Sequence, residues 1–424
     1  MSFEDSLAWA HAEDERDPLK RFRDEFRWPV SKNGYSPVYL CGNSLGLQPL
    51  RAAEYVQREL DKWGDHAVEG HFHDERPWLR FHRLAVEGFA TLTGAEPSEV
   101  VAMNTLTVNL HLLMASFYRP TSSRYKIVIE SNAFPSDRYA AASQIRMHGF
   151  DPDDGLLEWT PRDEDGYLDI ADLESLLEKE GDSTALLLLP GVQYYTGQVL
   201  DMARICRIGR DAGCSVGLDL AHAIGNVDLA LHKWAPDFAA WCTYKYLNAG
   251  PGAIAGAFVP ERHCAPDKLN QLHGWWGHDE KTRFRMLPSF TPAEGAELWQ
   301  MSNPPILSLA PVIASLELFL DAGMPRLREK SKNLTAYLAW LIGKRFGGRI
   351  DTISPPNERG CQLSLVVRDP AINAKALFDR LNAMNVIGDW REPDVIRVAP
   401  APMYNNFSDV FEFAERLGTA LEQN

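Results

Sequence analysis

Two charged side chains lie at the ends of hydrophobic segments that are close together in the sequence. Lys245 follows the apolar run DFAAWC at 237–242, and Asp219 lies in the run CSVGLDL at 214–220. A buried charge is costly unless a partner compensates it, so both positions suggest a functional site that supplies such partners. A lysine desolvated at a strand end has a lowered pKa and can form an imine. Taken singly, Lys245 could instead extend to solvent at a strand edge, and Asp219 could cap a helix.

The separation of these two residues favours a particular cofactor. Lys245 stands 26 positions after Asp219, and a βαβ crossover of about this length places two strand ends side by side. Pyridoxal phosphate needs a carboxylate at its ring nitrogen, because the charged ring then accepts electrons. We therefore predict pyridoxal 5'-phosphate as the cofactor, held by Lys245 and Asp219. His222, three residues after Asp219, could orient that carboxylate or contact the phosphate.

The segment NTLTVNLHLLMASFY at 104–118 could hold the phosphate. Asn104 or Thr105 is a plausible N-cap of a helix with an apolar stripe. A helix N-terminus binds phosphate through free N–H groups and the helix dipole, and here Leu106 and Thr107 would supply the amides. The segment has no glycine-rich phosphate loop, so a plain core helix is the alternative.

The loop SNAFPSDRY at 131–139 could approach the cofactor ring. An aromatic side chain such as Phe134 stacks well on a planar cofactor. The alternative is an ordinary turn that uses Pro135 and caps the next helix with Ser136.

Alternating elements must position these residues. Continuous hydrophobic runs separated by helix-length amphipathic segments are typical of βαβ units and a mostly parallel sheet. Ligands of such sheets bind at the carboxyl ends of the strands, and Asn132, Asp219 and Lys245 all lie at or just after expected strand ends. The expected strands cover 124–131, 183–192, 214–220 and 237–244, and the expected helices cover 136–149 and 201–213.

The order of the predicted helices and strands changes after SNPPI at 302–306. Two long helices are expected next, then two strands with a helix between them and a helix at the C-terminus. Because NPP interrupts the earlier pattern, we place the domain boundary near 304–310. The predicted divisions are an N-terminal segment at 1–60 that associates with the small domain, a large cofactor-binding domain at 61–305, and a small α+β domain at 306–424.

Bulk composition narrows the class of protein. The chain has 424 residues, 45% of them hydrophobic, and a formal net charge of −15. The acidic balance argues against non-specific nucleic-acid binding, and neither a signal peptide nor an apolar run of about 20 residues is visible. The six cysteines form no CxxC pair, and HFH at 71–73 has no acidic or cysteine partner at ligand spacing. We therefore expect a cytoplasmic enzyme without a metal, a membrane or a nucleic-acid partner.

The whole set of motifs resembles the kynureninase family, within the aspartate-aminotransferase-like (fold type I) pyridoxal-phosphate enzymes. The resemblance is carried by DLAHAIGNVDLALHKWAPDFAAWCTYKYLNAGPGAIAGAF at 219–258 and by LCGNSLGLQP, GHFHDERPW, LTVNLHLLMASFY, FPSD, GVQYYTGQ, GWWGH, QMSNPPI and IRVAPAPMYN. Single motifs are modest, but in this order they are specific and cover nearly the whole chain. The resemblance implies an α/β fold with a large domain, whose mostly parallel sheet is flanked by helices, and a smaller C-terminal α+β domain.

The resemblance also implies roles for individual residues. Lys245 would carry the cofactor and move the substrate Cα proton, Asp219 would pair with the pyridine nitrogen, and Tyr244 would carry a proton. Phe134 would stack on the ring, and Arg397 would bind the substrate carboxylate. Further implied cofactor contacts are Leu106, Thr107, Asp137, His222, Tyr244, Trp275 and Asn303, and further implied substrate contacts are His71, Ser302 and Asn303.

Two of these positions bear on assembly, and one further position departs from the family pattern. Trp275 and Asn303 match positions that reach a site across an interface, so the resemblance implies a homodimer with shared active sites. Pro190 stands where a small hydroxyl residue is expected before GVQYYTGQ. A proline cannot donate a hydrogen bond, so no contact is carried over to it.

The implied reaction is hydrolysis of L-kynurenine or 3-hydroxy-L-kynurenine to anthranilate or 3-hydroxyanthranilate and L-alanine, in tryptophan degradation. His71, Ser302 and Asn303, which are expected at the aryl end of the substrate, match the polar residues of family members that favour 3-hydroxykynurenine. Two alternatives stay open. A cysteine desulfurase of the same fold would need a mobile nucleophilic cysteine, and Cys361 in the apolar strand CQLSLVVRD suits that role poorly. A catalytically silent binding protein of this fold would not need Lys245, Asp219 and Arg397.

Overall fold

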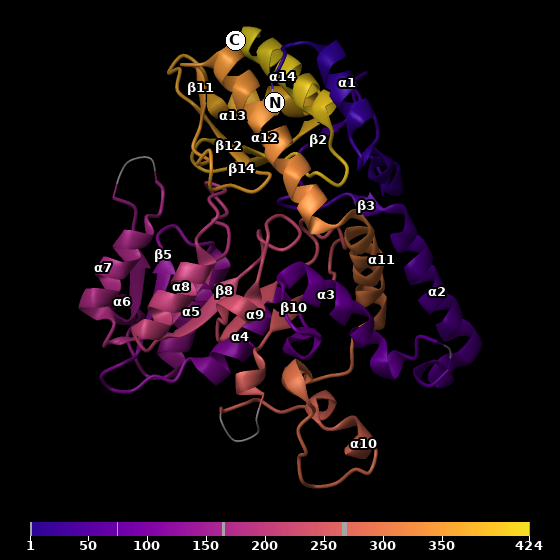
Figure 1. Ribbon diagram of the computed structural model, residues 1–424, viewed down its shortest axis with the longest axis vertical. Coiled ribbons are helices and arrows are strands. Elements are labelled where there is room, and N and C mark those ends of the chain that lie inside the picture. Colours follow the sequence, from indigo (N-terminus) through magenta and orange to yellow (C-terminus); the bar gives the residue numbers. More distant parts are fainter. Residues whose placement is uncertain (1, 74, 163–165, 265–268, 424) are drawn as a thin grey trace.

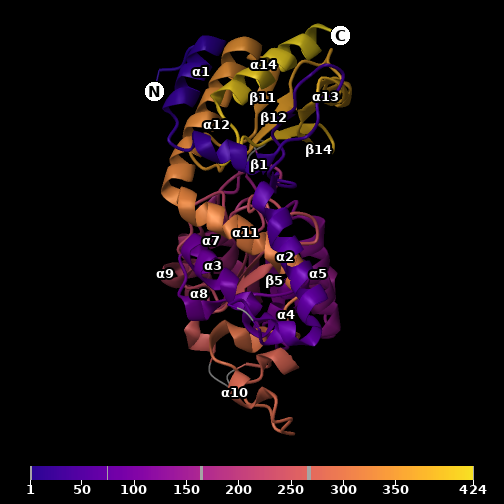
Figure 2. The ribbon, with the colours of Figure 1, turned by 90° about the vertical axis from the view of Figure 1, so that its right-hand side faces the viewer.

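Two lobes stand one above the other in the computed structural model, which describes residues 2–73, 75–162, 166–264 and 269–423. Figures 1 and 2 show the N-terminal and C-terminal helices together in the upper lobe and the central sheet in the lower, larger lobe.

A seven-stranded sheet forms the centre of the larger lobe. Strands β6, β5, β7, β8 and β9 run parallel to one another, and β10 pairs antiparallel with both β9 and β4. The predicted mostly parallel sheet is therefore confirmed. The strands, in the order β4-β10-β9-β8-β7-β5-β6, are Val100–Ala102, Gly256–Phe258, Phe238–Trp241, Ser215–Asp219, Thr184–Pro190, Lys126–Glu130 and Leu156–Trp159.

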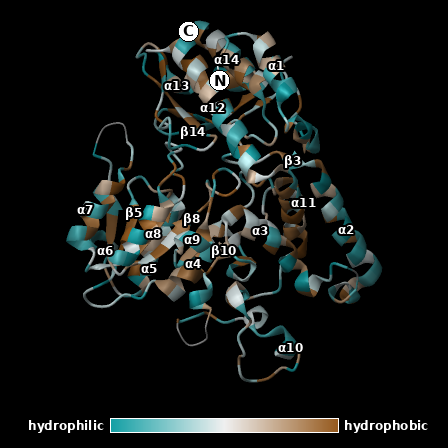
Figure 3. Ribbon diagram, in the orientation of Figure 1, coloured by the Kyte–Doolittle hydropathy of each residue, from teal (hydrophilic) through white to brown (hydrophobic). Residues whose placement is uncertain are grey.

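Helices cover both faces of this sheet, because successive residues of a strand point to opposite sides. In β9, Phe238 and Ala240 pack in the cluster that contains α4 and α5, while Ala239 and Trp241 pack in the cluster that contains α3, α7, α8 and α11. Figure 3 shows hydrophobic residues concentrated along the strands and α11. These helices are α3 (Val86–Thr93), α4 (Leu106–Phe117), α5 (Pro135–Met147), α7 (Ile170–Glu180), α8 (Met202–Asp211) and α11 (Ile306–Ala322).

Local signals set the ends of the two predicted helices. Asp201 caps α8 by accepting a hydrogen bond from the amide of Arg204 at 2.9 Å, and Gly213 (φ +71°) follows its last turn. Helix α5 begins at Pro135, whose fixed φ suits a first turn, and Gly149 (φ +85°) follows its end. Ser136 is not the cap, because Phe134 occupies that position.

The smaller lobe is a four-stranded antiparallel sheet packed on helices. Its strand order is β11-β12-β15-β14, and its core joins these strands to α12, α13 and α14. The α+β character predicted for the C-terminal region is therefore present. The elements are α12 (Met324–Phe346), β11 (Ile350–Thr352), β12 (Leu363–Val367), α13 (Ala374–Ala383), β13 (Val386–Ile387), β14 (Asp389–Arg391), β15 (Val395–Val398) and α14 (Phe407–Glu422).

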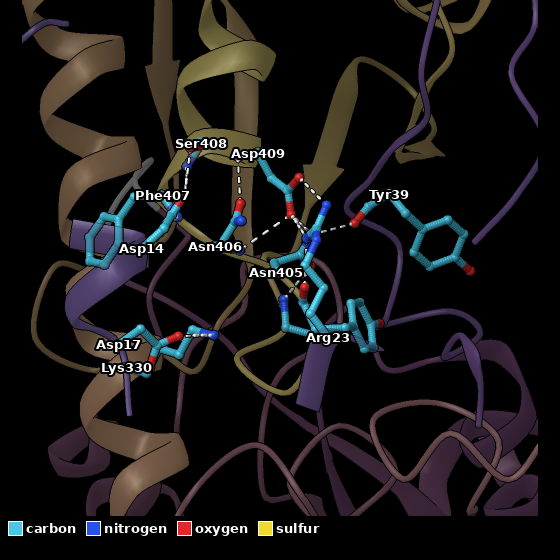
Figure 4. Close-up of polar contacts among 12 residues, drawn as sticks. Asp14, Asp17, Arg23, Tyr39, Lys330, Asn405, Asn406, Phe407, Ser408 and Asp409 are labelled. Atoms are coloured by element: carbon cyan, nitrogen blue, oxygen red, sulfur yellow. Dashed lines mark hydrogen bonds and ion pairs between the residues drawn. The ribbon is translucent and has the colours of Figure 1, made fainter. Parts of the chain in front are cut away.

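The N-terminal segment is attached to the smaller lobe by polar contacts (Figure 4). Helix α1 (Leu7–Arg16) packs on α14, and strand β2 (Val38–Tyr39) pairs with β13. The Arg23 guanidinium contacts the Asp409 carboxylate at 2.6 Å, and Lys330 contacts Asp17 at 2.7 Å. These contacts support the proposal that the segment associates with the small domain, although α2 (Leu50–His66) packs instead on α11.

Helix α11 lies with the larger lobe rather than with the smaller one. Its buried residues belong to the cluster of α3 and the central sheet, and it meets α12 at an 81° bend. We therefore propose that the chain passes between the lobes at Gly323, after the 304–310 boundary that the NPP signal predicts. Among the described residues, no single helix is long and apolar enough to cross a membrane, and only α11 and α12 meet that criterion as a bent pair.

Candidate active site

One cavity lies at the carboxyl ends of the parallel strands. The last residues of β5, β7 and β8 line it, and so does the segment after β9 that carries Lys245. This is the edge at which ligands of parallel sheets bind. The cavity brings together eight of the residues expected from the sequence, namely Leu106, Thr107, Phe134, Asp137, Asp219, His222, Tyr244 and Lys245.

Lys245 and His222, which both line this cavity, contact each other. Nζ of the lysine lies 2.9 Å from Nε2 of the histidine. Burial, reinforced by the charge of Lys245, lowers the pKa of His222 well below its ordinary value. His222 is therefore a neutral acceptor for the lysine amine, a role that differs from the two predicted for it.

Two carboxyl groups face each other at the end of β8. Asp219 is only 6% exposed, accepts a 2.6 Å hydrogen bond from the amide of Ala221, and is hydrogen-bonded to Asp137. Burial, together with the negative charge of Asp219, raises the pKa of Asp137 well above its ordinary value. Burial also raises the pKa of Asp219, but hydrogen bonds from Asp137 and from the Ala221 amide oppose this rise. Asp137 therefore holds the shared proton, and Asp219 carries the negative charge.

A third acid, Glu130, was missed by the motif reasoning. It is the last residue of β5, is 4% exposed, and lines the same cavity. Burial raises its pKa to about 8. Its place at an expected strand end, in RYKIVIES, was the signal that could have found it.

The N-terminus of α4 opens into the cavity. Thr105 is the N-cap, but its side chain makes no capping hydrogen bond, and Asn104 turns its amide to Asn109 instead. The amides at Leu106 and Thr107 are thus not used by a capping side chain. The hydroxyl of Thr107 pairs with that of Ser136 at 2.7 Å, which joins this helix start to the start of α5.

Tyr194 is a second residue that motif reasoning missed. It lines the cavity, and its ring meets Phe134 edge to face with centroids 5.2 Å apart. Its backbone carbonyl accepts a 2.7 Å hydrogen bond from Nη1 of Arg397. The GVQYYTGQ motif that contains it was the available signal.

Arg397 lies beside the cavity without lining it. It is fully buried, and its Nη2 forms an ion pair with Asp389. Burial lowers the pKa of Arg397 from its ordinary value. The sequence prediction did not foresee that a carboxylate of the chain itself contacts this arginine.

Besides Arg397, four expected site residues do not line the cavity of the same chain. The indole of Trp275 is half exposed and donates to the carbonyl of Arg283 at 3.3 Å, and His71 contacts the carbonyl of Val68 at 3.0 Å. Ser302 and Asn303 are exposed. One chain therefore does not bring these four residues to Lys245.

Two further side chains concern the departure from the family pattern at position 190 and the cysteine-desulfurase alternative. Pro190 ends β7 opposite Asp219 and lines the cavity without a hydroxyl group. Cys361 is fully buried, and burial raises the pKa of its thiol to about 12. A thiol that is buried and protonated is a poor nucleophile.

GNSLG at 42–46 has the GxSxG spacing of a hydrolase elbow, a match that motif reasoning overlooked. The stretch forms turns rather than the strand–turn–helix of that motif. Gly46 instead packs on the lysine segment, where its amide donates to the carbonyl of Tyr244 at 2.9 Å. No group of three metal-ligating side chains that could hold an ion occurs among the described residues.

The donors and charges of the cavity fit pyridoxal phosphate. A buried carboxylate at Asp219 suits a protonated ring nitrogen, and the open N-terminus of α4 suits a phosphate. Lys245 lines the same cavity, with its Nζ 5.9 Å from the ring centroid of Phe134.

Comparison with protein families finds two matches. Residues 39–369 match the class-V aminotransferase family, and residues 327–417 match the kynureninase C-terminal domain. A kynureninase of Xanthomonas campestris pv. campestris is 52% identical, with 98% of each chain covered. A kynureninase of Myxococcus xanthus is 51% identical, with 98% of this chain and 97% of that protein covered.

Solved structures show the same fold at low identity. The cysteine desulfurase CsdA of Escherichia coli has a TM-score of 0.76 and 18% identity, with 96% of this chain and 98% of that chain covered. A cysteine desulfurase of Thermococcus onnurineus NA1 has a TM-score of 0.74 and 17% identity, with 98% of both chains covered. At this identity the likeness establishes the fold alone, which is the predicted fold type I.

Proposed function

The chain belongs to the kynureninase family, and on this basis we propose that it hydrolyses L-kynurenine or 3-hydroxy-L-kynurenine with pyridoxal 5'-phosphate. The products are anthranilate or 3-hydroxyanthranilate and L-alanine. The observation that carries the proposal is the placement of Lys245 against neutral His222 in one cavity with the buried carboxylate of Asp219.

The acid pair at the end of β8 would hold the cofactor ring. Pyridoxal phosphate supplies a protonated ring that accepts the electron pair released at the substrate. Asp219 would keep the ring nitrogen protonated, and Asp137 holds a proton of its own beside it. Because only one of these two carboxyls is charged, the pair balances a single positive charge on the ring.

The other end of the cavity would hold the cofactor phosphate and cover the ring. The free amides at the start of α4 face a bound anion favourably because the helix dipole adds to their hydrogen bonds. Phe134 would stack on the ring, and its edge-to-face contact with Tyr194 fixes its orientation.

Lys245 is the group to which we assign transfer of the substrate Cα proton. Its Nζ is held at 2.9 Å by His222, which remains neutral because it is buried. A neutral partner orients the amine without giving it a permanent counter-charge. The contact therefore directs the amine for proton transfer without placing a second positive charge beside it.

Tyr244 is the proton carrier that we propose for cleavage of the Cβ–Cγ bond. It lines the cavity, and burial raises the pKa of its phenol, which therefore stays protonated at neutral pH. One water adds to the γ-carbonyl and its oxygen leaves in the anthranilate carboxylate. The phenol can donate the proton that Cβ takes up as alanine forms.

We propose a homodimer in which each site contains residues of both chains. Trp275 and Asn303 are exposed and outside the cavity of their own chain, as expected of residues that act across an interface. Large apolar side chains are exposed in the same chain, among them Trp63, Phe72 and Met286, and burying any of them at an interface would stabilise a dimer. His71 and Ser302 are assigned to the same shared site.

We propose the cytoplasm as the location, with no nucleic-acid or membrane partner. The net charge of −15 disfavours nucleic acid. All six cysteines are free, which suits a reducing compartment.

Turnover of kynurenine by purified protein loaded with pyridoxal phosphate tests the function. We expect anthranilate fluorescence to rise with an equal amount of L-alanine, measured enzymatically. A cofactor-loaded protein that releases neither product would contradict the proposal and would favour a silent binding protein. Release of alanine from L-cysteine, with sulfur retained on the protein, would favour a desulfurase, which the buried Cys361 argues against.

A further inference from the structure

The register between β14 and β15 places an acid directly opposite Arg397. Asp389 is the cross-strand partner of Arg397, and Trp390 pairs with Ile396 on the alternate position. Arg391, two residues after Asp389, points to the same side of the strand as Asp389. Oδ2 of Asp389 contacts Nη2 of Arg397 and lies 3.1 Å from Nη2 of Arg391.

This cluster keeps a buried charge compensated. The side chains of Arg397, Asp389 and Arg391 are 1%, 10% and 34% exposed. Removing a guanidinium from water is costly unless an opposite charge contacts it. Among the residues that the structure describes, Asp389 is the carboxylate that forms an ion pair with either arginine. The three side chains together carry one net positive charge.

The guanidinium of Arg397 keeps donors that this cluster does not use. Nη1 donates to the carbonyl of Tyr194 and Nη2 contacts Asp389, but Nε is buried without a hydrogen-bond partner among the described residues. A guanidinium presents five N–H groups in a fixed fork, so fixing its two Nη atoms also fixes the direction of Nε–H. Asp389 and the Tyr194 carbonyl thus determine which edge of Arg397 is available to a ligand.

The same cluster is linked to the cavity through Tyr194. The guanidinium carbons of Arg397 and Arg391 lie 5.9 and 6.0 Å from the centroid of the Tyr194 ring. That ring lines the cavity and contacts Phe134. A shift of Arg397 would therefore be transmitted to the residue that covers the cofactor ring.

We propose that Asp389 is a positioning residue that orients Arg397, and that Arg391 restores the single positive charge needed to receive one carboxylate. The inference rests on the proposed function, because the carboxylate is that of kynurenine. With the substrate carboxylate bound, two positive and two negative charges are present in the subsite. The opposite role for Asp389 would be that of an internal competitor that occupies Arg397 and weakens substrate binding.

The two roles predict opposite changes in KM when Asp389 is replaced by Asn. The variant has a more positive subsite, so a competitor's removal would lower KM. A positioning residue's removal instead raises KM, and we expect a rise of at least about 10-fold with kcat changed much less. Arg391→Gln should raise KM by about 3- to 10-fold, and Arg391→Lys should restore most of the affinity because it keeps the charge.

Ligand binding separates positioning from a general structural defect. We would titrate the cofactor-loaded protein with L-alanine and L-alaninamide by calorimetry, since only alanine has the carboxylate. Asp389→Asn should weaken alanine binding by about 10-fold and leave alaninamide unchanged. Asp379→Asn and Arg368→Gln are matched controls, because these small-lobe side chains are more than half exposed.

Each outcome has a distinct meaning. An inactive wild-type protein would overturn the proposed function. An active wild-type protein with an unchanged or lowered KM in Asp389→Asn would overturn the positioning role alone. Equal weakening of alanine and alaninamide would also overturn it, because the damage would not be specific for the carboxylate.

Discussion

Nζ of Lys245 lies 2.9 Å from Nε2 of His222, and this contact joins the segments that follow two adjacent parallel strands. Lys245 follows β9, and His222 follows β8. Burial keeps the histidine neutral, so the amine meets an acceptor rather than a second cation. The contact therefore holds the reactive lysine in a fixed direction at the edge of the sheet where the cofactor is expected.

Replacing Lys245 by Ala should remove the visible absorbance of the bound cofactor and lower turnover by more than about a thousandfold. Borohydride reduction followed by peptide mass spectrometry should locate the cofactor on Lys245 in the wild-type protein. Lys233→Ala, an exposed lysine in the same region, is the control and should behave as wild type. Trapping of the cofactor on another lysine would show that the assignment is wrong.

Glu130→Gln should change how stability depends on pH. Burial raises the pKa of Glu130 to about 8, so the folded protein holds this proton at pH values where the unfolded chain, with a pKa of about 4.3, has lost it. Stability therefore falls as pH rises from about 4.3 to 8. We would measure urea unfolding of the cofactor-free protein at pH 5, 6.5 and 8. From pH 5 to 8, the free energy of unfolding of the variant should rise relative to that of the wild type by a few kcal/mol.

The control for this comparison is Glu178→Gln, an exposed glutamate of α7. It should follow the wild-type pH dependence. If the curves of Glu130→Gln and the wild type stay parallel from pH 5 to 8, Glu130 does not take up a proton on folding.

Arg397→Ala should weaken kynurenine binding more than cofactor binding. Loss of a charge-assisted pair costs about 1.5–3 kcal/mol, which is roughly 10- to 150-fold in KM. Arg397→Lys should recover little, because an ammonium does not present the planar fork. Steady-state kinetics and cofactor titration measure the two effects, and an unchanged KM in the alanine variant would exclude this role for Arg397.

Activity should rise when two impaired variants are mixed, if the sites are shared. A dimer of one Lys245→Ala chain and one Asn303→Ala chain has one site with both residues intact. At equal amounts and after subunit exchange, about a quarter of all sites should be active. Light scattering should report a dimer. A fully active monomer would contradict the proposal that the two chains share their active sites.

The choice between substrates should depend on the shared residues. A ring hydroxyl buried without a partner is unfavourable, and His71 with Asn303 can supply partners. The double variant His71→Phe, Asn303→Ala should lower the kcat/KM for 3-hydroxykynurenine relative to that for kynurenine. Equal losses for both substrates would mean that these residues hold the cofactor or the common part of the substrate.

The sequence predicted the parts of the site that local patterns control. Hydrophobic runs with helix-length spacers predicted the parallel sheet, and a parallel sheet places its strand ends along one edge. Asp219, His222 and Lys245 therefore reach the same cavity, as their positions after expected strands implied. Helix ends near Gly149 and Gly213 were predictable for the same reason, since a left-handed glycine terminates a helix locally.

Only the tertiary structure decided which charges meet. The proton shared by Asp137 and Asp219, the raised pKa of Glu130 and the pairing of Arg397 with Asp389 all arise from burial and strand register. The same holds for α11, whose apolar sequence did not reveal that it packs against the larger lobe. A sequence pattern fixes which face of an element is apolar, but desolvation and Coulomb energy depend on distances between segments far apart in the chain.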